Sequence, residues 1–159
     1  MICYVWSRFA ALFVADLFWI NCKRVKDMIV SSAFILGWFA MHGCSAACGA
    51  GIVSNLQTES SLQACVRGPN GLGLAQWMGD RATKFLNRFG NRMCRVEDQL
   101  VFIIEELDEL GIKGRLFAET NPRRAAALFM HVFERPKHRD ARHTEKRCRK
   151  AEELYYAQN

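Results

Sequence analysis

One carboxylate in the chain stands out because of its neighbours. Glu59 lies at the end of an apolar run that contains Asn55, and Ser60 follows it directly. A glycine-spaced segment, Gly71-Leu-Gly-Leu-Ala-Gln-Trp77, comes a loop's length later. A lone acid beside a glycine-rich, sugar-sized groove is what the cleavage of a glycosidic bond needs, because the leaving oxygen must receive a proton. No other segment of the sequence offers an equally specific chemistry.

The expected surroundings of Glu59 favour its protonated form. The apolar run predicts that Glu59 lies near the carboxyl end of a helix, where the helix dipole disfavours an added negative charge. Partial burial beside Leu56 and Leu62 would act in the same direction. Asn55 lies four residues earlier on the same face, where it can orient the acid or contact a sugar. The alternative is a solvated glutamate at a helix terminus.

The glycine-rich segment offers groups that can bind a sugar. Glycine at 71 and 73 allows the backbone to approach a ligand closely. Gln76 carries a donor and an acceptor, and Trp77 has a flat apolar face suited to a sugar ring. Ser60 can contact substrate, although a local hydrogen bond at the helix end is its commoner role. The alternative makes Trp77 a core residue and Gln76 a loop tether.

These motifs, in their order and spacing, closely resemble those of the phage tail lysozyme family. The resemblance is carried by Gly51 to Ser60, by Gly71 to Trp77 and by Gly79-Asp-Arg81, and it continues through Asp98 to Leu107, Ala125 to Phe129, Phe133 to Pro136 and Ala151 to Tyr155. It covers residues 30–157, nearly everything beyond the amino-terminal run. Two positions depart from the family pattern, because Ser54 replaces a glycine and Met78 replaces a threonine.

The resemblance implies a lysozyme-like domain related to soluble lytic transglycosylases. Glu59 matches the catalytic acid of the family, and Gln76 and Trp77, together with Gly73, match its groove motif. The implied activity is a peptidoglycan glycosidase that cleaves the β-1,4 bond between N-acetylmuramic acid and N-acetylglucosamine. No metal or organic cofactor is implied. A non-catalytic wall-binding or virion structural domain with the same fold is the alternative of a different class.

The second catalytic group is open at the level of sequence. Asp80 is the nearest acid after Glu59, although capping of the following helix is its simpler role. Glu134 can instead pair with an arginine and fix the chain turn. If neither acid takes part, the 6-hydroxyl of the substrate can attack, which would make the enzyme a lytic transglycosylase.

The periodicity predicts a mainly α protein with one glycine-rich loop or small β-hairpin after the catalytic helix. Helices are expected over residues 28–42, 46–56, 81–89, 96–110, 121–133 and 140–156. The acids of the 96–110 helix, which include Glu106, are expected on its outer, solvated face. Asn121-Pro122 is a helix start, with the asparagine as N-cap. Residues 27–159 would form one catalytic domain.

Residues 1–26 form an apolar amino-terminal segment. Arg8, Asp16 and Asn21 interrupt it, so it is a marginal anchor or an export signal. A second candidate lies over residues 23–47, where basic residues are followed by an apolar stretch and then by small residues. This order is also that of a signal peptide. We prefer a first helix at 28–42, because the motif that follows needs it. The expected location is secreted, periplasmic or virion-associated, with membrane association through residues 1–26; the oligomeric state is open.

Charge and cysteine content set further bounds. The 159 residues carry a net charge of +6 with a pI of about 9.1, and half are hydrophobic, which favours a folded domain with an anionic partner. The basic run from Arg135 to Lys150 is expected to be a solvated helix face, and nucleic-acid binding is the weaker alternative. The seven cysteines, spaced unlike any common zinc site, are expected to be small buried residues; they are Cys3, Cys22, Cys44, Cys48, Cys65, Cys94 and Cys148.

Overall fold

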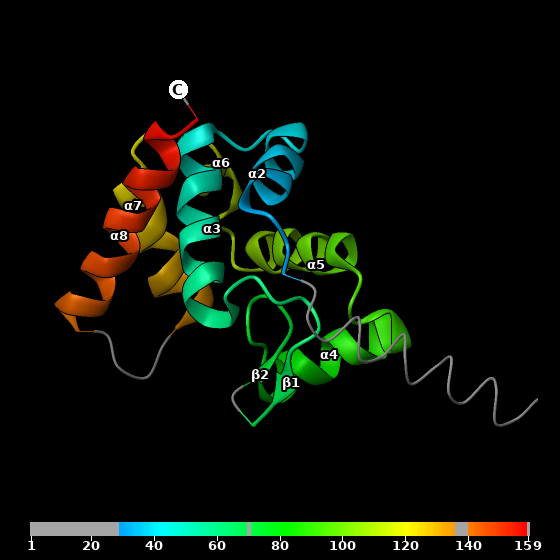
Figure 1. Cartoon of the computed structure of the whole chain (residues 1–159). Helices are drawn as coiled ribbons and strands as arrows, with labels where there is room; N and C mark the ends of the chain where they lie inside the picture. Colours follow the sequence, from blue (N-terminus) through cyan, green and yellow to red (C-terminus); the bar gives the residue numbers. More distant parts are fainter. Residues whose placement is uncertain (1–28, 70, 136–139, 159) are drawn as a thin grey trace, which may run out of the picture.

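The computed structural model describes residues 29–69, 71–135 and 140–158. The described chain is a set of packed helices with one small hairpin (Figure 1). In order, the elements are α2 (Ser32–Met41), α3 (Ala46–Ser60), β1 (Arg67–Gly68), β2 (Gly71–Leu72), α4 (Gly79–Phe89), the 3₁₀ turn η1 (Gly90–Arg92), α5 (Val96–Glu109), α6 (Lys113–Phe117), α7 (Pro122–Leu128), the π-helix η2 (Phe129–Glu134) and α8 (Ala141–Tyr156). The expected mainly α fold is confirmed. The predictions made for residues 1–26 lie outside the described residues.

Helix α3 is the central element, and α2, α7 and α8 pack against it (Figure 1). Its Ile52, Val53 and Leu56 side chains are fully buried. Gly51 permits the closest approach, because a Cβ added there would lie 2.7 Å from the Cβ of Ala125 on α7. The helix begins at its N-cap Ser45 and runs four residues beyond the predicted end at residue 56. Glu59 therefore lies inside the last turn rather than after it.

The glycine-rich segment folds back on itself below the end of α3 (Figure 1). Strands β1 and β2 pair antiparallel, with Arg67 opposite Leu72. Leu72 and Trp77 then exchange backbone hydrogen bonds of 3.0 and 2.9 Å. The buried Gln99 of α5 fastens this turn, because its side-chain oxygen accepts from the backbone N–H of Leu74 over 2.7 Å. The loop or hairpin expected here is thus a short hairpin followed by a tight turn.

The helix capped by Asn121 changes from α-helical to π-helical geometry before it ends. The Asn121 side chain accepts from the backbone N–H groups of Arg123 and Arg124, and Pro122 occupies the first helical position, as expected. From Phe129 to Glu134 the helix continues as a π-helix, and Arg135 ends it with a left-handed backbone (φ 49°). Wide turns of this kind occur often at functional sites. Here the turn brings Glu134 to the end of the element.

The cysteines are partly as expected. Cys44, Cys48 and Cys148 are buried free thiols. Cys65 and Cys94 instead form a disulfide, which joins the hairpin region to the start of α5 and corrects the expectation of small free residues. Within the described ranges, no helix has both the length and the apolar character needed to cross a bilayer.

Candidate active site

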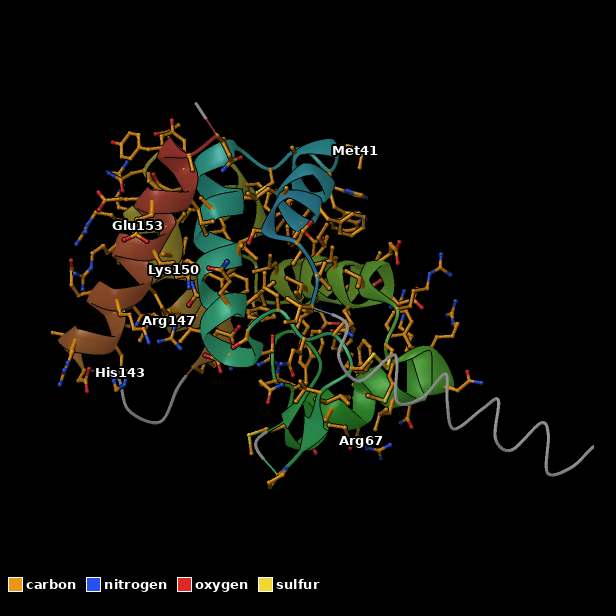
Figure 2. All side chains as sticks on the ribbon, in the orientation of Figure 1. Met41, Arg67, His143, Arg147, Lys150 and Glu153 are labelled. Atoms are coloured by element: carbon orange, nitrogen blue, oxygen red, sulfur yellow. A yellow bond between two sulfur atoms is a disulfide. The ribbon has the colours of Figure 1, made fainter. Side chains whose placement is uncertain are left out.

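Glu59 lies in the last turn of α3 and is held by an arginine from α8. The Nη2 group of Arg147 donates to Oε1 of Glu59 over 2.6 Å. The Arg147 side chain is only 6% exposed, whereas that of Glu59 is 24% exposed, so the acid keeps a face toward solvent. Figure 2 shows Arg147 on the part of α8 that lies beside the end of α3. The arrangement leaves a carboxyl group that is both fixed and accessible.

A second acid, Glu134, shares this region. Its Oε1 atom is buried and has no hydrogen-bond partner among the described residues. Burial raises the pKa of Glu134 well above its ordinary value, and the negative charge of Glu59 adds to that rise. Arg81 and Arg147 act in the opposite direction, and Glu106 adds a smaller rise in pKa. The protonated form of Glu134 is therefore favoured beside a Glu59 that is paired with a cation.

A buried network borders the two acids. Glu106 of α5 accepts from Trp77 Nε1 over 2.6 Å and from Arg81 through Nε over 2.6 Å and Nη2 over 2.8 Å. Arg81 also donates to the backbone oxygen of Phe133 over 3.2 Å and lies 4.5 Å above the centre of its ring. These contacts fix the residue that precedes Glu134. The expectation that Glu106 lies on a solvated face is wrong, because this residue is 6% exposed and both of its carboxylate oxygens accept hydrogen bonds.

Asn55 and Ser60 bond within the protein. Asn55 is fully buried, and its Nδ2 donates to the backbone oxygens of Gly51 over 2.8 Å and of Ala126 over 3.1 Å. It therefore ties α3 to α7. Ser60 is buried as well, and its hydroxyl donates to the backbone oxygen of Leu56 over 3.1 Å, which is the local role considered for it.

The groove residues expected from the glycine-rich segment are also engaged internally. Trp77 is 1% exposed, with the Phe85 ring stacked 4.9 Å away and the Phe102 ring 5.3 Å away. Gln76 donates from Nε2 to the backbone oxygen of Gly73 over 2.7 Å. The structure thus shows Trp77 as a core residue and Gln76 as a loop tether, the alternative weighed for both.

Glycine at 71 and 73 serves the same turn. Both have positive φ, of 143° and 65°, which favours glycine. The backbone of Gly73 lies close to the Gln99 side chain, whose Oε1 atom a Cβ would approach to 2.5 Å. The close approach expected toward a ligand is in this structure an approach toward the protein itself.

A pocket nevertheless adjoins this segment. It has a volume of about 230 Å³ and lies between the hairpin and α4, with Arg67, Leu72, Met78 and Leu86 in its lining. Met78, one of the two departures from the family pattern, is 58% exposed.

Asp80 is exposed in the first turn of α4, where an acid is favourable to the helix dipole. The N-cap of that helix is Met78, so the expected capping by Asp80 is wrong. Glu134 is the acid whose charge interacts with Glu59.

Arg147 is the residue that sequence reasoning missed. It was included in the solvated basic run from Arg135 to Lys150, yet it is 5% exposed. A signal was present in the sequence, because Arg147, Cys148 and Ala151 fall on one helical face with small and apolar side chains. Those three residues are the ones that α8 buries.

Comparison with known proteins identifies the family of the chain. The family model described as phage tail lysozyme matches residues 33–157. Morphogenesis protein 1 of Bacillus phage B103 is 28% identical over 131 residues, a match that covers 70% of this chain and 35% of that relative. The family match runs from the first turn of α2 to the end of α8. The chain belongs to the phage tail lysozyme family.

Proposed function

We propose that residues 27–159 form a peptidoglycan glycosidase domain that cleaves the β-1,4 bond between N-acetylmuramic acid and N-acetylglucosamine. Membership of the phage tail lysozyme family makes the domain lysozyme-like and points to peptidoglycan as the polymer on which it acts. The observation that carries the specific proposal is the position of Glu59. Its carboxyl group is partly exposed at the end of a buried helix, and its charge interacts with a second acid, Glu134, whose Oε1 atom is buried.

In this proposal Glu59 is the general acid. Its proton passes to the glycosidic oxygen while the bond from that oxygen to the sugar C1 breaks. The glycosyl cation then takes either water, which gives a reducing end, or the 6-hydroxyl of the same sugar, which gives a 1,6-anhydro end. Either nucleophile releases one proton, which returns to the site, so the chemistry balances without a cofactor.

The charge of the protein supports a polymer of the cell envelope as substrate. A net charge of +6 attracts anionic surfaces over long range. We further propose a virion-associated location, because the family is that of phage tail lysozymes and the relative in phage B103 is a morphogenesis protein. That relative is much longer than the match, so its remaining length offers no guide to this chain.

The decisive experiment is digestion of purified peptidoglycan with the protein and with a Glu59→Gln variant, followed by mass spectrometry of the released muropeptides. We expect wild type to release fragments with new reducing or 1,6-anhydro ends, which also distinguishes hydrolysis from transglycosylation. Loss of the general acid should lower the rate by about 10²- to 10⁴-fold. Glu153→Gln on the exposed part of α8 is the matched control and should retain full activity.

Two outcomes would contradict the proposal. Undiminished lysis by Glu59→Gln, with unchanged folding by circular dichroism, would remove Glu59 from the mechanism. Saturable binding of wild type to peptidoglycan without any new ends would identify a wall-binding domain instead.

A further inference from the structure

The charged groups around Glu59 do not balance. Arg81 and Arg147 supply two positive charges, and three acids face them: Glu59 from α3, Glu106 from α5 and Glu134 from η2. Arg81 and Glu106 neutralise each other through two hydrogen bonds. Arg147 is then left as one cation for two carboxyl groups. This cluster of five side chains is neutral only when it retains one proton.

The geometry indicates where that proton resides in the free protein. Arg147 donates to Glu59, so the positive charge of the guanidinium lies directly against that carboxyl group. The Oε1 atom of Glu134 is buried without a donor within the described chain, and an ionised oxygen in such a place would be costly. Arg147 Nε is likewise buried and has no partner among the residues that the structure describes, so this donor of the guanidinium serves neither acid. Glu134 is thus the favoured carrier.

We propose that Glu134 is a positioning residue that holds the catalytic proton, so that Glu59 and Glu134 together carry one proton and Arg147 compensates the single negative charge. This inference rests on the proposed function of Glu59 as the general acid. It names the second acid that the sequence left open. It also explains how a glutamate paired with an arginine can donate a proton at neutral pH.

The sharing has a consequence for the dependence of activity on pH. While the pair holds one proton, a fixed minor fraction of molecules carries it on Glu59, whatever the pH. Activity is therefore level until the pair loses its one remaining proton. Burial of Glu134 and the like charge of Glu59 move that loss to higher pH. A single carboxyl group without such a partner instead loses its protonated fraction tenfold with each pH unit above its midpoint.

In the reaction, the pair gives its proton through Glu59 to the glycosidic oxygen. Both carboxyl groups are then ionised, and their negative charge stabilises the glycosyl cation that forms as the bond breaks. Water or the 6-hydroxyl attacks the cation, and the proton that it releases restores the singly protonated pair. No other reactant is needed.

The test compares kcat/KM on soluble peptidoglycan fragments between about pH 5 and 8 for wild type, Glu134→Gln and the surface control Glu153→Gln. Glutamine has the shape of a neutral glutamic acid but cannot exchange a proton. We expect level profiles for wild type and the control through the lower part of this range. Glu134→Gln should fall by about tenfold per pH unit and should recover toward acid pH. Parallel profiles for all three proteins would overturn the inference.

A titration of the wild-type protein, labelled with ¹³C at the glutamate carboxyl carbon, provides evidence that needs no variant to fold. One carboxyl resonance should titrate well above the ordinary glutamate range. Its chemical shift should also change in a second step when the neighbouring acid titrates. A single ordinary titration of Glu134 would refute the shared proton. If the wild type cleaves nothing, the proposed function fails, and this titration still decides the state of the pair. If it cleaves but the profiles are parallel, only the role of Glu134 fails.

Discussion

The hydrogen bond from Arg147 to Glu59 joins two residues that are 88 positions apart in the sequence. It connects the middle of α8 to the last turn of α3, so the carboxyl-terminal helix takes part in the site. The contact places a cation against Glu59, whereas the proposed reaction needs a proton there. Within the cluster, Glu134 acts in the opposite direction, because burial raises its pKa and so favours a retained proton.

Replacement of Arg147 by methionine should destabilise the fold at neutral pH. Methionine keeps much of the apolar stem but leaves Glu59 and Glu134 without their shared cation. We expect a loss of about 1–3 kcal/mol in the free energy of unfolding, measured by urea denaturation at pH 7. The loss should shrink toward acid pH, where the carboxyl groups no longer carry an uncompensated negative charge.

Lys146→Met is the control for this change, because Lys146 is the exposed neighbour on the same helix. Its effect should stay within about 0.5 kcal/mol at either pH. Equal stabilities of the two variants at pH 7 would show that Arg147 compensates no buried charge.

Glu134 should also shape the dependence of stability on pH. Its pKa is raised in the folded protein, so the folded state binds this proton more tightly than the unfolded chain does. The resulting stabilisation is complete below the unfolded pKa of about 4.3 and is lost as pH rises through the higher folded value. Glu134→Gln removes this contribution. Relative to wild type, the variant should therefore gain stability as pH rises.

The effect of Glu134 is read from the difference in stability between Glu134→Gln and wild type. This is necessary because Glu119 and Asp140 have lowered pKa values, and their contributions to stability grow with pH. These two groups are the same in both proteins and cancel. Urea denaturation from about pH 4 to 8 measures the difference. A difference that does not change with pH would mean that Glu134 titrates normally.

The sequence predicted the elements whose evidence is local. The period of the apolar residues located α3 and α5, and Asn121-Pro122 located the start of α7. The placement of Glu59 at the end of a buried helix followed from the same local pattern. These features depend on residues a few positions apart, where backbone geometry alone fixes which side chains share a face.

The remaining features depend on distant residues that no local pattern connects. The burial of Trp77 requires Phe85, Phe102 and Glu106 to surround it, and a glycine-rich motif gives no information on such packing. The role of Glu134 depends on a wide helical turn and on charges from four other elements, α3, α4, α5 and α8. Sequence reasoning could name these residues but could not place them together.

Loss of the Cys65–Cys94 disulfide should destabilise the protein substantially. The two cysteines are 29 residues apart, and closing a loop of that length in the unfolded chain corresponds to about 3–4 kcal/mol. The Cys65→Ser/Cys94→Ser double variant should lose this amount in urea denaturation. A reducing agent should lower wild type to the level of the variant and leave the variant unchanged.

Cys148→Ala is the control, because Cys148 is a free thiol in the structure. It should retain the response to reducing agent that wild type shows. If reduction leaves wild type as stable as before, the disulfide does not contribute to the fold.

Gly51→Ala should separate α3 from α7 and disturb the site at a distance. A Cβ at this position would lie 2.7 Å from both the Cβ of Ala125 and the backbone nitrogen of Ala126, and backbone cannot move aside cheaply. We expect a loss of about 1–3 kcal/mol in the free energy of unfolding.

Gly37→Ala on α2 is the matched control, because open space surrounds Gly37 and alanine is the better helix former by about 0.5–1 kcal/mol. Opposite signs for the two changes would confirm that close packing selects glycine at 51, whereas equal gains in stability would refute it.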